Sequence, residues 1–457
     1  MSAQYQLSGR SASEIAASVE RGVAAGALAP GAPLPSVRAL AATLDVSPTT
    51  VAAAVADLRR RGVVVSRPRS GTRIGERPAV RARGGPVTPA GIRDLASGNP
   101  DPAFLPDLAA ALRELPAPHR LYGEAPVLEE LAAVAMRAEA GDDAVGRGSP
   151  AATGDRLAAP SAPRPSGRLC VVNGALDGIE RVLAAHLQPG DAVAVEDPGW
   201  PGVIDLVRAL GLRVAGVPAD ARGMVPEALE RALRGGARAV VLTPRGQNPT
   251  GAAHDSARAA ELRSVLTPDV LLVEDDHLGP VAGVPWHSAA GSAARHAVVR
   301  SVSKWLGPDL RCAILTGDEL TLARVEGRQS LGPGWVSGII QRLTARLWSD
   351  PAVLALVARA GDAYVERREA MLAALAAHGV EASGASGLNV WVPVPDEDAA
   401  VRALLATGVS IAAGAPFRLA TPPAVRITTA TVTPEQAPEL AAALAAAVRP
   451  PRRTRAA

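Results

Sequence analysis

The residues best suited to covalent chemistry centre on one lysine. The chain holds 48 lysine and arginine residues, and Lys304 is its sole lysine. Arginine serves well for surface charge and anion binding, but its guanidinium stays protonated and cannot form a Schiff base. One lysine among so many arginines could be a surface residue retained by chance. Its neighbours favour a position that needs a nucleophilic amine.

The residues around this lysine are suited to binding a phosphate. Ser301 and Ser303 supply hydroxyl donors, and Arg311 supplies a guanidinium that can bind a phosphate in a bidentate manner. A further anion site is predicted where V-V-N-G-A-L-D-G passes from a strand into a helix. The first helical amides, those of Ala175 and Leu176, can hold a phosphate there, although most such turns are structural.

Three more loops carry groups that can surround a flat heteroaromatic ring. Trp200 in E-D-P-G-W-P-G could stack on such a ring, although a lone tryptophan is more often a core or interface residue. Asn248 in Q-N-P-T-G could hydrogen-bond a ring hydroxyl. Asp275 in V-L-L-V-E-D-D-H could pair with a protonated ring nitrogen. A metal site is the alternative for this acidic run, but no His or Cys stands at a matching spacing.

Together these residues predict pyridoxal phosphate (PLP) bound covalently through Lys304. An anionic Asp275 would keep the ring nitrogen protonated, so that the ring can accept electrons from a substrate α-carbon. Exchange with an amino substrate would free Lys304 to act as a base. Arg426, in A-V-R-I-T-T-A, could bind a substrate carboxylate.

Parallel strands are expected to position these loops. Apolar segments alternate with amphipathic helices at 169–172, 192–196, 213–217, 239–243, 270–274, 297–301 and 313–316. Continuous apolar strands between helices indicate a mostly parallel sheet covered on both faces, with ligands at its strand ends. Residues 387–394 and 424–430 then suggest a smaller α+β domain.

The N-terminal residues 5–75 have a different pattern. Helical spacing begins at residue 12, Ser36 is a plausible N-cap of a second helix, and Ser47 caps a third that starts at Pro48. Residues 63–74 then form two short strands around a basic tip. A helix-turn-helix with a β-wing is a DNA-binding plan, and a small helical subdomain with a basic surface is the alternative. The third helix would present Thr49 and Thr50 to DNA, and the wing Arg67, Arg69 and Arg73.

Charge supports this division of the chain. Residues 1–93 hold 13 arginines and 5 acidic residues, which gives +8, whereas the whole chain carries +3. A basic N-terminal part on a larger acidic one suggests contact with nucleic acid. We expect a DNA-binding domain at 1–75, a linker at 76–93, a PLP-binding domain at 94–449 and a basic tail at 450–457. Residues 141–168 are expected to form a disordered insertion.

Cysteine usage and hydropathy predict the compartment. Cys170 and Cys312 both lie in apolar, strand-like runs and are expected to be reduced core residues. No signal peptide and no apolar run of membrane-spanning length is recognised. The expectation is a soluble cytoplasmic protein with no metal site and no membrane contact.

The N-terminal part resembles the GntR family of winged-helix regulators. The similar segments are P-G-A-P-L-P-S-V-R-A-L-A, V-S-P-T-T-V and L-R-R-R-G-V-V-V-S-R-P-R-S-G-T. Pro48 stands where many relatives have a basic residue. The resemblance implies contacts with double-stranded DNA for Arg38, Thr49, Thr50, Arg67 and Gly71.

Residues 94–449 resemble fold-type I aminotransferases, and the joined architecture resembles the MocR subgroup of GntR regulators. The similar segments are S-G-N-P-D, L-Y-G, N-G-A, E-D-P-G-W-P-G, Q-N-P-T-G, V-E-D-D-H, S-V-S-K-W-L-G-P-D-L-R and Arg426. The resemblance implies a homodimer in which Tyr122 reaches the cofactor phosphate of the neighbouring subunit. It also implies a swapped, head-to-tail arrangement, with each DNA-binding domain resting on the partner.

The sequence departs from these families at three positions. His277 stands where relatives have a tyrosine; it could donate the same bond to the ring oxygen and would titrate near neutrality. Trp200 replaces a usual tyrosine or phenylalanine. Asn248 is common in true aminotransferases and often aromatic in MocR regulators, which favours catalytic competence.

Three functions are compatible with these features. The first is a transcriptional regulator whose aminotransferase-like domain senses PLP or an amino compound. The second is an active aminotransferase for amino acids and 2-oxo acids with an accessory DNA-binding domain. The third is a structural DNA-binding dimer with a vestigial cofactor site. The regulator is favoured because an intact DNA-binding domain and a basic wing have no use in simple metabolism.

Overall fold

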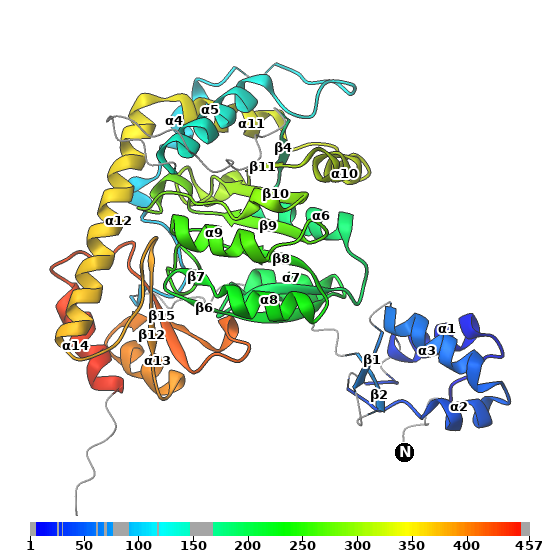
Figure 1. Cartoon of the computed structure of the whole chain (residues 1–457). Coiled ribbons are helices and arrows are strands. Elements are labelled where there is room, and N and C mark those ends of the chain that lie inside the picture. Colours follow the sequence, from blue (N-terminus) through cyan, green and yellow to red (C-terminus); the bar gives the residue numbers. More distant parts are fainter. Residues whose placement is uncertain are drawn as a thin grey trace, which may run out of the picture. The chain divides into compact units, whose positions relative to one another are not determined.

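The fold was analysed in a computed structural model, which describes residues 6–24, 27–29, 31–60, 63–67, 71–75, 91–116, 118–146 and 168–448. A small N-terminal domain, the head, ends at residue 75, and a large domain, the body, begins at residue 91 (Figure 1). Residues 76–90 of the expected linker and the basic tail at 450–457 lie outside the described residues.

The head contains three helices and a two-stranded antiparallel sheet. The helices are α1 (Ala12–Ala24), α2 (Val37–Leu44) and α3 (Pro48–Arg60), and the strands are β1 (Val64–Arg67) and β2 (Gly71–Ile74). Both predicted N-caps are present: Ser36 Oγ accepts from Ala39 N at 3.2 Å, and Ser47 Oγ accepts from Thr50 N at 3.1 Å. Each cap satisfies an amide that has no partner within its helix.

The turn between α2 and α3 gives the angle typical of a helix-turn-helix. Asp45, with a left-handed φ of 53°, ends α2, and the two helices are bent by 118°. The buried side chains of Ile15, Leu40, Val51 and Leu58 hold the three helices together. No single described helix is long and apolar enough to cross a membrane; only α2 and α3 taken together pass that test, as a bent pair.

The body is built on an eight-stranded sheet in the order β4-β11-β10-β9-β8-β5-β6-β7. Strands β8, β9 and β10 pair in parallel, whereas β11 is antiparallel to both of its neighbours. All seven strands expected from the sequence are present, and the eighth, β7, is too short to show a pattern. The bounds are β4 (Cys170–Val172), β5 (Ala192–Asp197), β6 (Arg213–Asp220), β7 (Gly223–Met224), β8 (Ala237–Leu242), β9 (Leu271–Asp276), β10 (Arg295–Ser301) and β11 (Ala313–Gly317).

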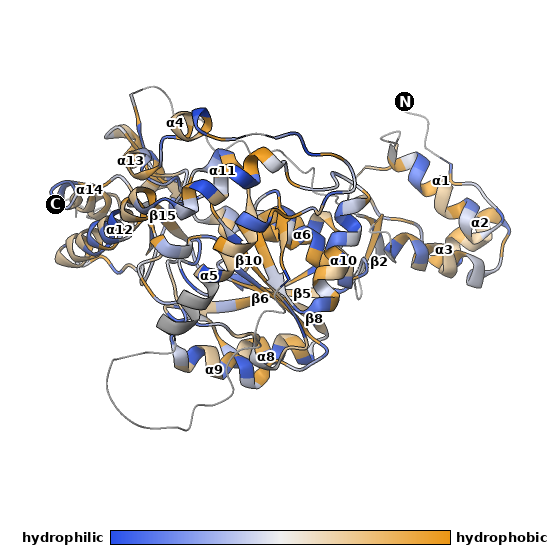
Figure 2. Cartoon of the chain, turned by 90° about the horizontal axis from the view of Figure 1, so that it is seen from above, coloured by the Kyte–Doolittle hydropathy of each residue, from blue (hydrophilic) through white to orange (hydrophobic). Residues whose placement is uncertain are grey.

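Helices cover this sheet. Every residue of β5 and β9 is buried, which requires packing on both faces of the sheet, and Figure 2 shows hydrophobic strands between helices of mixed hydropathy. Helices α6 and α10 pack together and against β10, whereas α8 packs against α9 and β8. The bounds are α6 (Ala175–His186), α7 (Pro201–Ala209), α8 (Pro226–Arg234), α9 (Ser256–Val265) and α10 (Glu319–Ser330).

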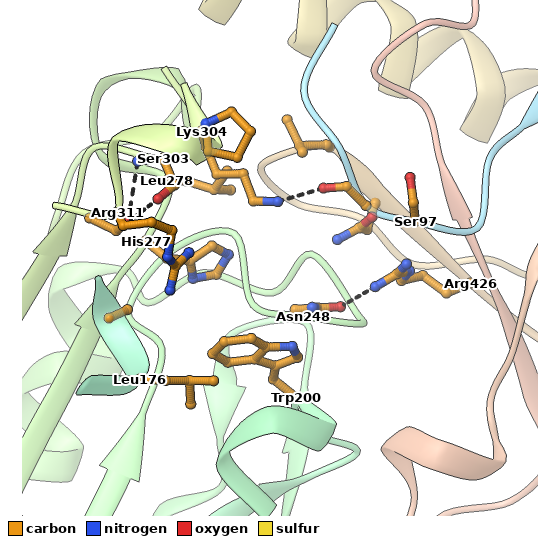
Figure 3. A pocket seen from close by; sticks show the side chains of 16 residues that line it. Ser97, Leu176, Trp200, Asn248, His277, Leu278, Ser303, Lys304, Arg311 and Arg426 are labelled. Atoms are coloured by element: carbon orange, nitrogen blue, oxygen red, sulfur yellow. Dashed lines mark hydrogen bonds between the residues drawn. The ribbon is translucent and has the colours of Figure 1, made fainter. Parts of the chain in front are cut away.

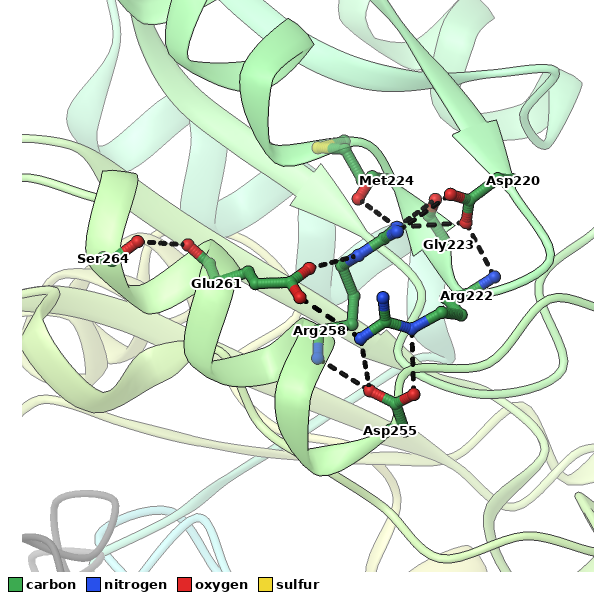
Figure 4. A network of polar contacts seen from close by, with 8 residues as sticks. All are labelled: Asp220, Arg222, Gly223, Met224, Asp255, Arg258, Glu261 and Ser264. Atoms are coloured by element: carbon green, nitrogen blue, oxygen red, sulfur yellow. Dashed lines mark hydrogen bonds and ion pairs between the residues drawn. The ribbon is translucent and has the colours of Figure 1, made fainter.

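An ion-pair network fastens the β6–β7 hairpin to α9 (Figure 4). Arg258 of α9 donates to the carbonyls of Gly223 and Met224 at 3.1 and 2.9 Å and pairs with Asp220 at 2.8 Å. Arg222, in the turn of the hairpin, pairs with Asp255 at 2.8 Å. The edge of the large sheet is therefore held by charges that take no part in the site described below.

A smaller antiparallel sheet carries the C-terminal part of the predicted site. It consists of β12 (Asn389–Pro393), β15 (Ala424–Thr428) and β14 (Ala412–Ala413), and is packed by α12 (Pro351–Ala377), α13 (Glu397–Ala406) and α14 (Ala437–Val448). A parallel pair, β3 (Arg93–Asp94) with β13 (Val409–Ser410), ties the first described residues of the body to this domain. The predicted α/β body with a smaller α+β domain is thus confirmed.

The remaining helices are α4 (Leu108–Arg113), α5 (Glu129–Gly146), α11 (Gly338–Ser349) and five short 3₁₀ segments, η1 (Pro102–Phe104), η2 (Gly279–Val281), η3 (Ala290–Ser292), η4 (Pro308–Leu310) and η5 (Ala415–Phe417). Helix α5 continues through Gly146 and so includes the first six residues of the segment expected to be disordered, 141–168. Residues 147–167 of that segment lie outside the described residues.

Candidate cofactor site

One cavity of about 280 Å³ brings together residues from both sheets of the body (Figure 3). It contains ten of the twelve residues that the sequence assigns to the cofactor or its substrate; Asp275 and Tyr122 are not among the lining residues. The lining residues are Ser97, Gly98, Ala175, Leu176, Trp200, Asn248, His277, Leu278, Ser301, Ser303, Lys304, Pro308, Arg311, Leu388, Asn389 and Arg426.

Lys304 lies in the turn that follows β10, and its side chain points across the cavity (Figure 3). Its Nζ donates to the carbonyl of Gly98 at 2.6 Å. Burial lowers the pKa of this amine to about 8, and the nearby positive charge of Arg426 acts in the same direction. An appreciable fraction of the amine is therefore unprotonated near neutral pH, as a nucleophile must be.

Asp275 is the second-last residue of the buried strand β9, and it is 2% exposed. Its Oδ1 is buried with no hydrogen-bond partner among the described residues. Burial, followed by the negative charge of Asp276, raises its pKa to about 7. A buried carboxylate without a partner is costly, and a ring N–H that carries positive charge would supply the missing donor.

Asp276, the next residue, is fully paired. Its carboxylate accepts two hydrogen bonds of 2.8 Å from Arg245, and Arg300 lies 3.6 Å away. These arginines hold the pKa of Asp276 at about 2, against the effect of burial. The two adjacent carboxylates thus differ: Asp276 is paired with arginines, whereas Asp275 Oδ1 accepts no hydrogen bond from a described residue and Asp275 Oδ2 lies 3.8 Å from Nδ1 of His277.

The phosphate-binding residues predicted from the sequence surround a glycine. A Cβ at Gly174, whose φ is +90°, would lie 2.7 Å from Nη2 of Arg311, so the glycine makes room for the guanidinium. Arg311 forms no hydrogen bond or ion pair with any described residue. Ser301 Oγ and Ser303 Oγ lie 3.1 Å apart, and Ser303 N donates to Ser301 Oγ.

The N-terminus of α6 completes this anion site. Ala175 and Leu176 line the cavity, and the capping carboxylate of Asp177 accepts from Asn173 N at 2.9 Å rather than from either of them. Their amides therefore remain available to an anion at the positive end of the helix.

His277 and Trp200 occupy the cavity as the sequence analysis expected. The titration of His277 differs from expectation, because burial and then the charge of Lys304 lower its pKa to about 4. The imidazole is thus neutral at physiological pH and retains one N–H to donate. Trp200 lies flat over Gly202, where a Cβ would come within 2.9 Å of the indole ring.

Arg426 reaches the cavity from β15 of the small sheet. Its Nη1 donates to Asn248 Oδ1 at 2.9 Å, and its Nη2 donates to the carbonyl of Ala96. Burial lowers its pKa to about 10, so that it stays cationic at neutral pH. Gly98 separates this guanidinium from the lysine amine: a Cβ at Gly98 would lie 3.3 Å from Arg426 Nη2.

Tyr122 lies elsewhere. It is 94% exposed, and its ring packs edge-on against Trp335 with 5.6 Å between the ring centroids. It contributes nothing to the cavity of its own chain.

The head exposes part of its predicted DNA-contacting set. Arg38 and Thr49 are exposed, and Gly71, with φ +74°, has no atom within 4 Å of a Cβ placed on it. Thr50 is half-buried, with its hydroxyl 2.8 Å from that of Ser47. Arg73 donates to the carbonyl of Gly31 at 3.0 Å and so fixes the wing to the preceding loop. Arg67 is the last residue of β1, and Arg69 lies outside the described residues.

The sequence analysis did not identify every residue of the cavity. Ser97 and Gly98 lie in the quoted motif S-G-N-P-D, but the sequence gave neither of them a role in the site. Leu278, Pro308, Leu388 and Asn389 gave no signal, because they belong to ordinary strand and turn patterns. Among the described residues, no group of three or more His, Cys, Asp or Glu side chains could hold a metal ion.

Comparison with known families defines the class of this architecture. The profile of the aminotransferase class I and II family matches residues 160–444, and that of the bacterial regulatory proteins of the gntR family matches residues 11–74. The chain therefore belongs to the aminotransferase class I and II family through its body and is, with its GntR head, a MocR-type regulator. PLP is the cofactor of this fold.

Individual relatives share the whole architecture. The vitamin B6 salvage pathway transcriptional repressor PtsJ of Salmonella typhimurium is 39% identical, over 95% of this chain and 98% of the relative. The HTH-type transcriptional regulator TauR of Rhodobacter capsulatus is 30% identical, over 87% and 88%. An archaeal alanine:glyoxylate aminotransferase, 21% identical, has the fold of the body, with a TM-score of 0.68 over 78% of this chain and 90% of that one.

Proposed function

We propose that this protein is a DNA-binding transcriptional regulator whose body binds PLP and senses PLP itself or an amino compound. The observation that carries the proposal is the presence in one chain of a GntR-type head and of a cavity lined by ten of the twelve residues that the sequence assigns to the cofactor or its substrate. The name of PtsJ, a repressor of vitamin B6 salvage, supports a B6 compound as one signal.

The residues of the cavity fit PLP group by group. Lys304 supplies the amine for the aldehyde, and Asp275 Oδ1 supplies the missing acceptor for the ring nitrogen. His277 and Asn248 provide donors for the ring oxygen, and Trp200 provides a stacking surface. The amides of Ala175 and Leu176, with Ser301, Ser303 and Arg311, would hold the phosphate.

When bound, PLP supplies an electron sink for a substrate α-carbon. The protein's own part is to hold protons and charge. Asp275 would hold a proton at the ring nitrogen, and the free amine of Lys304 would hold or move a proton beside the carbonyl of Gly98. Arg426 orients a carboxylate while its own position is fixed by Asn248 and Ala96.

We infer that the protein acts as a cytoplasmic homodimer with swapped, head-to-tail subunits. The exposure of Tyr122 supports this, since a ring that is 94% exposed on its own chain can reach a second subunit. Two free, buried cysteines fit a reducing compartment. Double-stranded DNA would be bound through Arg38, Thr49, Thr50, Arg67, Arg69 and Gly71.

The absorbance spectrum of the purified protein, before and after borohydride reduction, tests the site. A pyridoxyl adduct on Lys304 after peptide mapping is the expected result, whereas a protein that stays colourless with added PLP would support the vestigial site. Mixing with amino acids and 2-oxo acids then separates the two remaining functions. A single spectral change that alters DNA affinity supports the sensor; product formed over many cycles would support the aminotransferase.

A further inference from the structure

Asn389 is a buried polar residue of the cavity to which no role has yet been given. It is the first residue of β12 and is 6% exposed. Its Oδ1 accepts a hydrogen bond of 3.0 Å from the hydroxyl of Thr428, with which it is paired in register across β12 and β15. Because this bond engages the amide oxygen of Asn389, its amide nitrogen, Nδ2, is the atom left for another partner.

The strand register places Asn389 beside Arg426. Arg426 and Thr428 are two residues apart on β15, so their side chains leave the same face of the small sheet. Asn389 is directly opposite Thr428 and therefore belongs to the same face. It is diagonal to Arg426, and residues in this relation on neighbouring strands lie roughly 7–8 Å apart. A ligand that touches Arg426 lies within reach of the Asn389 amide.

Packing holds the residue in place. A Cβ at Gly251 would lie 2.9 Å from the Asn389 carbonyl oxygen, and one at Gly384 would lie 3.1 Å from it. The two glycines thus allow the Q-N-P-T-G loop and the 383–386 turn to close on the start of β12. The backbone and the side-chain oxygen of Asn389 are both constrained.

The amide nitrogen of Asn389 is unused. No described residue accepts a hydrogen bond from its Nδ2, and Asn389 is one of the residues that line the cavity. The Nδ2 of Asn389 is thus an uncharged donor near Arg426. The guanidinium of Arg426 already donates one N–H to Asn248 and another to the carbonyl of Ala96. A carboxylate has lone pairs for more donors than the guanidinium has left.

We propose that Asn389 is a specificity-determining residue that acts with Arg426 to select amino compounds carrying a carboxylate. Arg426 supplies the charge, and Asn389 supplies a neutral donor whose direction Thr428 sets. The inference rests on the proposed function, since it assumes that an amino compound enters the cavity beside Lys304.

The test compares L-alanine with ethylamine, which is alanine without its carboxylate. Each is titrated into the PLP-loaded full-length protein, followed by the change in cofactor absorbance. Asn389→Leu, of similar volume, removes the donor and should raise the apparent Kd for L-alanine about tenfold, as expected for a lost hydrogen bond to a charged group. Asn389→Asp places a negative charge there and should weaken L-alanine further.

Ethylamine is the internal control, because both variants should bind it within about twofold of the wild-type value. Thr428→Val, which keeps the shape but removes the hydroxyl, should weaken L-alanine by less than Asn389→Leu does. Equal affinity of Asn389→Leu and wild type for L-alanine would overturn the inference, and so would parallel losses for both compounds. If the wild-type protein binds PLP but its cofactor absorbance changes with neither compound, amino-compound sensing itself would be overturned, and the inference with it.

Discussion

Asp275 provides the sharpest test of the cofactor site. Replacing it with asparagine should stabilise the cofactor-free protein and should weaken its binding of PLP. In the cofactor-free protein its Oδ1 is buried without a partner, and its pKa is raised from 3.8 to about 7. Its unfolded form ionises near 3.8, so the folded state is penalised at every pH above that value. One pKa unit corresponds to about 1.4 kcal/mol, so the penalty reaches about 4 kcal/mol above pH 7.

Asp275→Asn removes this charge and should therefore stabilise the cofactor-free protein. The gain is expected to be about 4 kcal/mol at pH 8, to fall to about 2 kcal/mol at pH 5, and to vanish below about pH 4. The same substitution should weaken PLP binding by a factor of 100 or more, since a buried cation would lose its partner.

Urea unfolding of both proteins between pH 5 and 8, with PLP removed, measures the stability difference, and absorbance titration measures the PLP affinity. Glu196 and Glu274, whose pKa values burial raises to about 8 and about 7, are present in both proteins and largely cancel in the comparison. Asp362→Asn, at an exposed position of α12, is the matched control. A pH-independent difference, or a less stable Asp275→Asn variant at pH 8, would refute the assignment of Asp275 as an unpaired buried charge.

Three further variants, one of them a double substitution, test separate parts of the molecule. Lys304→Ala should abolish the covalent, borohydride-reducible attachment of PLP while leaving the circular dichroism unchanged; a retained adduct would disprove the assignment. Gly174→Ala should displace the Arg311 guanidinium, which would lie 2.7 Å from the new Cβ, and should lower the affinity for inorganic phosphate and PLP about tenfold or more; unchanged binding would place the phosphate elsewhere. Replacing Arg67 and Arg69 with Ala should weaken DNA binding and lower the slope of log affinity against log salt by up to about 2; an unaltered slope would show that the wing does not contact DNA.

The strands and caps could be predicted from the sequence because local physics determines them. Continuous apolar runs between helical patterns, such as 270–273, are typical of strands in a sheet covered on both faces. Ser36 and Ser47 stand directly before helical patterns, and both cap as expected. Strand β7 could not be predicted, because two residues give no period.

Site residues could be predicted where the residue type itself indicates the chemistry. They were harder to predict where the role depends on tertiary packing. A sole lysine and an aspartate at a strand end carry their chemistry in their identity. Asn389 does not, because its function depends on the register of β12 with β15, and this register is long-range information. The pKa of His277 could not be predicted from the sequence either. Burial lowers this pKa to about 4, and burial is a property of the tertiary structure.

The construction of the cavity suggests how occupancy could reach the rest of the molecule. Asp275 belongs to the large sheet and Lys304 follows its strand β10, whereas Arg426 and Asn389 belong to the small sheet. The two sides already meet through polar contacts: Arg426 donates to Asn248, and Asp197 of β5 accepts hydrogen bonds from the amides that follow Arg418, those of Leu419, Ala420 and Thr421. An amino compound that reacts with PLP on the large-sheet side, and whose carboxylate is held by Arg426, would add a further contact between the sheets and would favour the arrangement that makes this contact. The residues that would hold PLP alone, such as Lys304 and Arg311, lie on the first side, so the two kinds of signal would be physically distinct. PLP would fill the cofactor pocket, whereas an amino compound with a carboxylate would also contact Arg426 of the small sheet.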